Sequence, residues 1–200
     1  MFSSGNNIIS TTSGCPVTHA SGDQFDVNPV LGTFLPTQGY HPLLAGSPAI
    51  NAGNPATCLL TDQRGVARVG TCDIGAYEYT APGAATSLSI VSGNSQRVAP
   101  LFAFAKPLKA VALDSQGSPV PNVNITFTAP ASGASGTFAN TGTNTTSALT
   151  DAGGVATTST FIANNQFGSY SLSASTSGLS SINFSLENVA WYVSLSGNDA

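Results

Sequence analysis

The chain has 200 residues, of which 41% are hydrophobic and only 7% are charged, and its formal net charge is -4. A chain of this length can form one or two small hydrophobic cores. Because charges are few and no basic run occurs, the composition excludes an electrostatic footprint for nucleic acid or an anionic membrane. Glycine, serine, threonine, asparagine and proline are abundant, which favours an all-β chain with many turns.

The first part of the chain is irregular. Ile8–Ile9 and residues 27–31 are short apolar runs bounded by glycine, asparagine, proline or serine, and this pattern predicts short strands joined by loops. The X–Pro pairs at positions 28–29 and 35–36 disfavour a helix, because the residue before a proline avoids the helical region. Short strands separated by such turns fit a β-solenoid with irregular corners.

Several motifs then carry a resemblance. Residues 23–31 (DQFDVNPVL), 46–53 (GSPAINAG), 62–65 (DQRG), Arg68 and 72–78 (CDIGAYE) resemble the closing segment of the choice-of-anchor Q proteins. The resemblance implies that residues 1–80 hold the last coils and the cap of a right-handed parallel β-helix of the pectate-lyase-like type. It also implies a secreted or surface-exposed bacterial protein, generally without an assigned activity.

The charges of this segment suggest how a cap is held together. Arg64 and Arg68 lie among Asp62, Asp73 and Glu78 in a chain with few other charges, so guanidinium–carboxylate pairs are expected to tie the loop over the end of the solenoid. An alternative is a paired-carboxylate site that cleaves a sugar chain or eliminates at a sugar. A calcium site built from Asp and Asn oxygens is a third interpretation, although no ordered ligand spacing supports it.

The three cysteines leave two interpretations open. Cys58 and Cys72 lie on either side of the DQRG turn. A disulfide between them would stabilise the cap in an oxidising compartment, and Cys15 would then have no partner among the three cysteines. Alternatively, these cysteines and His19 form a zinc site, although the chain has no CxxC pair. A cysteine and His41 could in principle form a cysteine-protease pair, but no neighbouring residue in the sequence indicates a cysteine activated as a nucleophile.

After Tyr79 the pattern changes. Residues 80–85 (TAPGAA) form a short linker, and apolar and polar residues alternate beyond it, which predicts strands with one buried face. Turn signals separate these strands as in a β-sandwich of about 100 residues. The alternating segments are residues 87–90, 122–128, 169–175 and 182–187.

A second resemblance covers residues 81–190. Residues 108–127 (LKAVALDSQGSPVPNVNITF), 150–156 (TDAGGVA) and 168–174 (GSYSLSA) are similar to bacterial Ig-like domains of the intimin and invasin type. In that family the modules act as spacers or presenters in adhesins, so the resemblance implies an antiparallel Ig-like sandwich with stalk or adhesion duty. The sandwich has no cysteine and must be stabilised by burial alone.

The last segment, residues 191–200, contains YVSLSGND and resembles the opening strand of a further parallel β-helix. Together these features predict a non-catalytic fragment of a multidomain bacterial secreted or cell-surface protein, with the Ig-like module as a spacer or adhesion unit. The alternative is a fragment of a carbohydrate-active β-helix enzyme of the polysaccharide lyase or glycosidase type. We expect an extracellular location, surface glycans or a host or neighbouring cell surface as partners, and no cofactor, nucleic acid or membrane span.

Overall fold

The computed structural model describes residues 3–13 and 18–189. Within them it contains strands and no helix, which confirms the all-β prediction. Cys15 and the strand expected in residues 191–200 lie outside the described residues. The strands are β1 (Ile8–Ile9), β2 (Gln24–Phe25), β3 (Ser87–Ser92), β4 (Gln96–Val98), β5 (Lys109–Leu113), β6 (Asn124–Thr128), β7 (Gly136–Phe138), β8 (Thr145–Leu149), β9 (Val155–Thr157), β10 (Phe161–Ala163), β11 (Gly168–Ser175) and β12 (Ile182–Asn188).

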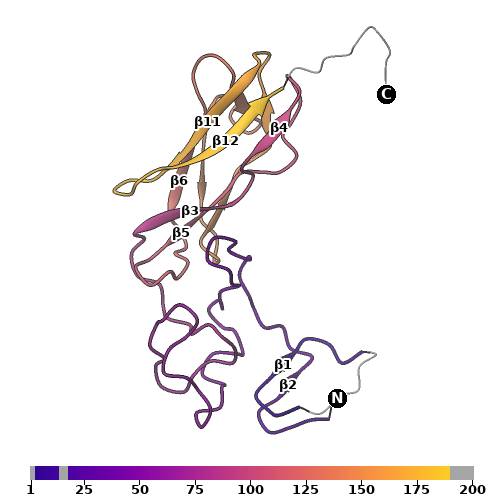
Figure 1. The fold of residues 1–200 in the computed structure, drawn as a ribbon, viewed down its shortest axis with the longest axis vertical. Helices are drawn as coiled ribbons and strands as arrows, with labels where there is room; N and C mark the ends of the chain where they lie inside the picture. Colours follow the sequence, from indigo (N-terminus) through magenta and orange to yellow (C-terminus); the bar gives the residue numbers. More distant parts are fainter. Residues whose placement is uncertain (1–2, 14–17, 190–200) are drawn as a thin grey trace, which may run out of the picture.

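The second part of the chain is a β-sandwich (Figure 1). One sheet has the order β4-β12-β11-β6-β8 and the other the order β3-β5-β9, while β10 and β7 form a separate ribbon. The β11-β12 pair is antiparallel and has the longest register, from Gly168↔Asn188 to Ala174↔Ile182. In β6, β11 and β12 the buried positions alternate with more exposed ones, as the sequence pattern predicted.

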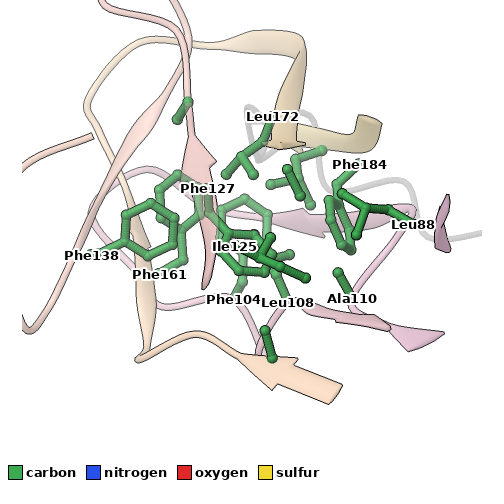
Figure 2. Close-up of a cluster of buried hydrophobic side chains, with 14 of the residues drawn as sticks. Leu88, Phe104, Leu108, Ala110, Ile125, Phe127, Phe138, Phe161, Leu172 and Phe184 are labelled. Carbon is green, nitrogen blue, oxygen red and sulfur yellow. The ribbon is translucent and has the colours of Figure 1, made fainter. Parts of the chain in front are cut away.

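A single apolar core lies between the two sheets, and Figure 2 shows its side chains converging. The five-stranded sheet contributes Phe127, Leu172 and Phe184, and the three-stranded sheet contributes Leu88 and Ala110. Four phenylalanines are among the fully buried side chains of the described residues: Phe127, Phe138, Phe161 and Phe184. Large aromatic side chains supply much of the apolar area that a sandwich without disulfides needs.

The first part of the chain has little regular structure. β1 and β2 form a short parallel pair with the register Ile8↔Gln24. The strand predicted at residues 27–31 is wrong, because only Leu31 takes part in a bridge, with Leu43. Pro29 lacks an N–H, and Val30 has a φ of 50°, outside the extended region. A complete parallel β-helix is therefore not shown by the described residues.

A second core joins the two parts of the chain. It combines Leu35, Tyr40 and Leu43 from the first part with Val111 and Val155 from the sandwich. Side chains alternate across a strand, so β5 contacts the first core through Ala110 and Ala112 and the second core through Val111 and Leu113. The three-stranded sheet is thus buried on both faces.

The linker at residues 80–85 is fixed onto the sandwich. The Thr80 hydroxyl makes a hydrogen bond to Ser118 Oγ at 3.2 Å, and the Gly83 N–H donates to Asp114 Oδ2 at 3.0 Å. Both contacts are to the turn that follows β5. The linker predicted at residues 80–85 is thus hydrogen-bonded to the sandwich at Thr80 and Gly83.

Candidate functional site

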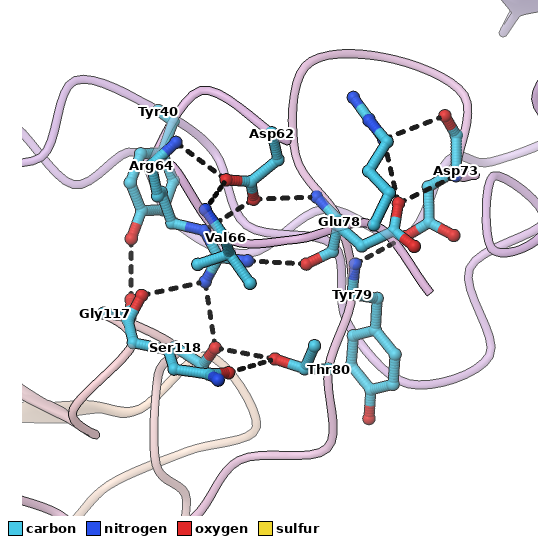
Figure 3. Close-up of polar contacts among 12 residues, drawn as sticks. Tyr40, Asp62, Arg64, Val66, Asp73, Glu78, Tyr79, Thr80, Gly117 and Ser118 are labelled. Atoms are coloured by element: carbon cyan, nitrogen blue, oxygen red, sulfur yellow. Dashed lines mark hydrogen bonds and ion pairs between the residues drawn. The ribbon is translucent and has the colours of Figure 1, made fainter. Parts of the chain in front are cut away.

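Five charged residues of the first part meet in one buried network, which we call the capping network: Asp62, Arg64, Arg68, Asp73 and Glu78. Figure 3 labels Asp62, Arg64, Asp73 and Glu78 in it. Asp62 organises its first half. Its Oδ1 accepts the backbone N–H groups of Arg64 at 2.8 Å and Val66 at 3.1 Å, and its Oδ2 accepts the Glu78 N–H at 3.1 Å. An aspartate that accepts hydrogen bonds from following backbone amides favours a tight turn, so the DQRG sequence folds back on itself here.

Arg64 links this turn to the sandwich. Its Nε donates to Asp62 Oδ2 at 2.8 Å, and its side chain is only 7% exposed. The two terminal nitrogens donate to different partners, one to Ser118 Oγ at 2.9 Å and the other to the Glu78 carbonyl at 2.6 Å. The guanidinium also lies 3.9 Å from the centroid of the Tyr77 ring, a cation–π contact.

Arg68 and Glu78 form the second half of the capping network. Arg68 Nη1 donates to Glu78 Oε2 at 2.8 Å, and Arg68 Nη2 donates to the Gly75 carbonyl at 2.8 Å. The Glu78 carboxylate also accepts the N–H groups of Val69 and Asp73, both at 3.0 Å. Asp73 makes no ion pair with either arginine among the described contacts, and its carboxylate instead accepts the N–H groups of Asn51 and Tyr79.

The two buried aspartates have pKa values shifted in opposite directions. Burial alone would raise the pKa of Asp62, but hydrogen bonds from the Glu78 amide and the Arg64 side chain outweigh it and lower that pKa. At Asp73, burial is the largest effect and raises the pKa, although the Tyr79 and Asn51 amides oppose it. Hydrogen bonds thus determine the direction of the shift at Asp62, whereas burial determines it at Asp73.

Tyr40 makes a further contact across the junction, which the sequence did not predict. Its hydroxyl donates to the Gly117 carbonyl at 2.6 Å, and burial raises the pKa of this phenol to about 12. Gly117 has a φ of 78°, a left-handed conformation that glycine adopts without strain. The turn after β5 therefore presents both this carbonyl and Ser118 to the first part of the chain.

The described cysteines and histidines make separate contacts and do not form a shared site. Cys58 and Cys72 form a disulfide with their Cα atoms 6.4 Å apart, within the usual range. His19 stacks on Phe25 with ring centroids 3.9 Å apart, and His41 Nδ1 contacts the Gly32 carbonyl at 2.9 Å. In residues 3–13 and 18–189 no group of three or more His, Cys, Asp or Glu residues is placed to hold a metal ion.

Every carboxylate of the capping network is occupied by backbone amides or arginines. Asp62, Asp73 and Glu78 are 6%, 3% and 2% exposed, so little of their surface is open to a substrate. The arrangement closes and orients a loop, and the same groups hold that loop against the sandwich. No helix long and apolar enough to cross a membrane occurs in the described part of the chain.

No family model matches the chain, and no curated protein matches it. Among solved structures it is partly similar to invasin, a bacterial integrin-binding protein, at 20% identity over 52% of this chain and 19% of that chain, with a TM-score of 0.38. The adhesin InvE of Yersinia pseudotuberculosis gives 19% identity over 59% and 36%, with a TM-score of 0.42. A β-glucuronidase of Parabacteroides merdae gives 15% identity over 56% and 13%, with a TM-score of 0.36.

The chain thus spans a fifth or less of invasin and of the β-glucuronidase and about a third of InvE. The similar structures include adhesin domains and also one region of a glycoside hydrolase. Because all three TM-scores are below 0.5, we rest no argument about function on them.

Proposed function

We propose that this chain is a non-catalytic module of a bacterial secreted or cell-surface protein, in which the Ig-like sandwich is a spacer or adhesion unit. In this proposal residues 1–80 are the last coils and cap of a parallel β-helix of the choice-of-anchor Q type. The observation that carries the proposal is the three-stranded sheet buried on both faces. A sheet packed in this way fixes the direction in which one part of the chain leaves the other, which is what a spacer requires.

Two further observations support a structural role and an extracellular location. The carboxylates of the capping network are buried and fully engaged in hydrogen bonds and ion pairs, as in structural ion-pair networks. The Cys58–Cys72 disulfide suits an oxidising compartment. Counting free thiols tests the location: one free thiol of three cysteines fits a secreted protein, and three free thiols contradict it.

Residual dipolar couplings measured by NMR on the whole chain test the spacer role. If the junction is rigid, one alignment tensor fits the amides of the capping segment and of the sandwich together. Tyr40→Phe removes the hydroxyl that contacts Gly117 but keeps the ring in the second core, so it should leave a single tensor. Separate tensors for the two parts of the unmodified chain would contradict the proposal.

A turnover assay separates this function from the enzymatic alternative. The chain is incubated with neutral and acidic polysaccharides, and new reducing ends and unsaturated products are measured. We expect no turnover. Turnover that is abolished in Asp73→Asn or Glu78→Gln, in protein that remains folded, would establish the enzyme instead. Binding to a glycan array or to cells without turnover would favour an adhesion unit over a purely mechanical spacer.

A further inference from the structure

The outer edge of β3 is open. β3 is the first strand of the three-stranded sheet, and in the described residues its only strand partner is β5. Its sequence, SLSIVS, contains no charged residue and no proline, the residues that commonly prevent an edge from pairing with another chain. The one irregularity is a register shift between Ile90 and Ser92, which leaves the first four residues in regular register. This edge can accept a further strand.

A groove of about 1040 Å³ runs along that edge. Residues 88–97 line it continuously, from β3 through the next turn into β4, and Pro36, Lys106 and Ile182 lie on its walls. β12 pairs with β11 along its whole length and with β4 only from Leu186 onward, and the outward N–H and C=O of Ser185 bond to Asn94 and Ser95. Among the described residues, only 182–184 of β12 therefore lack a strand partner on the side of the groove. An extended segment in this groove would therefore lie along the β3 edge and beside Ile182 and Asn183 at the beginning of β12.

The exposed positive charge of the chain gathers around the same groove. Of the five Lys and Arg residues, Arg64 and Arg68 are buried in the capping network. Arg97 and Lys106 line the groove, and Lys109 lies opposite Ser92 of β3.

These three cations are available to a partner to different degrees. Within the described residues no carboxylate is within ion-pair distance of Lys106 or Lys109, and Arg97 pairs with Glu187 while remaining 68% exposed. Because the groove is lined by Arg97 and Lys106 and, among the described residues, by no Asp or Glu residue, it favours an acidic occupant by charge complementarity.

Lys106 is held at the rim by its backbone. The Gln96 side chain accepts the Lys106 N–H at 2.8 Å and donates to the Lys106 carbonyl at 2.9 Å. The same amide donates to the Gly93 carbonyl at 2.8 Å, which ties together the two sides of the turn. The ammonium is thus attached to a fixed backbone beside the open edge.

We propose that this groove binds an extended, acidic segment of a partner polypeptide by strand addition to β3. In this mode main-chain hydrogen bonds supply affinity, and side-chain contacts supply specificity. Glutamate or aspartate side chains on the added strand reach Lys106 and Arg97. This proposal goes beyond the spacer function. The spacer function depends on a rigid junction and is tested by the residual dipolar couplings, whereas the groove is tested by peptide binding.

The test uses the whole chain and two capped heptapeptides that alternate threonine and valine, one with two glutamates and the other with two lysines at the same places. Binding is followed by amide chemical shifts and hydrogen exchange. We expect the acidic peptide to bind, to perturb residues 88–97 and 182–184, and to slow exchange of amides in β3. Binding should weaken as salt is raised, because the charges are solvent-exposed.

Charge-neutralising variants locate the site. Lys106→Gln and Arg97→Gln should each weaken the acidic peptide by about two- to fivefold, the range for exposed charge pairs. Gln166→Glu changes the net charge by the same single unit as each of these variants, on an exposed loop that does not line the groove, and should leave binding unchanged. Circular dichroism confirms that each variant is folded.

Four outcomes would overturn the proposal. They are no binding of the acidic peptide, equally tight binding of the lysine peptide, binding that leaves exchange in β3 unchanged, and equal weakening by Gln166→Glu. Polygalacturonate serves as a further probe. If it perturbs the same residues while neither peptide binds, the groove recognises an acidic polysaccharide and strand addition is wrong.

Discussion

Replacing Arg64 by alanine tests whether the capping network stabilises the fold. The Arg64 side chain is 7% exposed and donates to Asp62, Ser118 and the Glu78 carbonyl. Its removal leaves the Asp62 carboxylate, whose side chain is fully buried, without its ion-pair partner. Breaking a buried ion pair on one side costs about 3–5 kcal/mol, so we expect the free energy of unfolding to fall by about that amount.

Urea unfolding followed by circular dichroism measures this loss, and the chain supplies a matched control. Arg97 pairs with Glu187 at the same 2.8 Å distance as the Arg64–Asp62 pair, but its side chain is 68% exposed. Exposed pairs contribute about 0–1 kcal/mol, so Arg97→Ala should change stability little. If Arg64→Ala costs no more than Arg97→Ala, the claim that the capping network stabilises the junction is refuted.

Three other perturbations have defined outcomes. Phe127→Ala empties a fully buried site of the sandwich core and should cost about 3–5 kcal/mol in the same unfolding assay; a loss under about 1 kcal/mol would contradict the packing. Hydrogen bonds hold the pKa of folded Asp62 below its ordinary 3.8 despite the opposing effect of burial, so its contribution is present above pH 3.8 and is lost as the pH falls through the folded value. Stability measured from neutral to acidic pH should therefore fall less in Asp62→Asn than in the unmodified chain, and equal slopes would refute this. Reducing the Cys58–Cys72 disulfide, which spans 14 residues, should cost about 3 kcal/mol; no change in the urea midpoint on adding reductant would show that the loop does not need it.

The sandwich was predictable because most of its strands have one buried and one exposed face. In β12 the buried Phe184 and Leu186 alternate with the exposed Asn183 and Ser185, and a period of two is the direct sequence signal of that environment. Residues 27–31 gave an apolar run without alternation. Such a run does not specify a strand by itself, and Pro29 removes one of the backbone donors a ladder needs.

The sequence indicated which charged residues of the capping network would be neighbours but not how they are used. Few charges in one short segment must pair if they are buried, and Arg64 and Arg68 do contact Asp62 and Glu78. Asp73 is instead held by backbone amides, and no local pattern distinguishes these two fates. Tyr40 and Arg64 contact the turn after β5 across 77 and 54 residues of sequence. Patterns of local residue spacing do not predict contacts at such separations.

One signal of the junction was present in the sequence of β5. KAVAL is apolar at four consecutive positions, and all four of these residues are buried; a continuous apolar run is typical of a strand covered on both faces. Burying a valine or leucine side chain contributes about 1.5–3 kcal/mol, so exposing Val111, Leu113 and Val155 by separating the two parts would cost several kcal/mol. The apolar run of β5 therefore favours a sandwich held in one orientation, although TAPGAA alone reads as a linker, and the alignment measurement tests this.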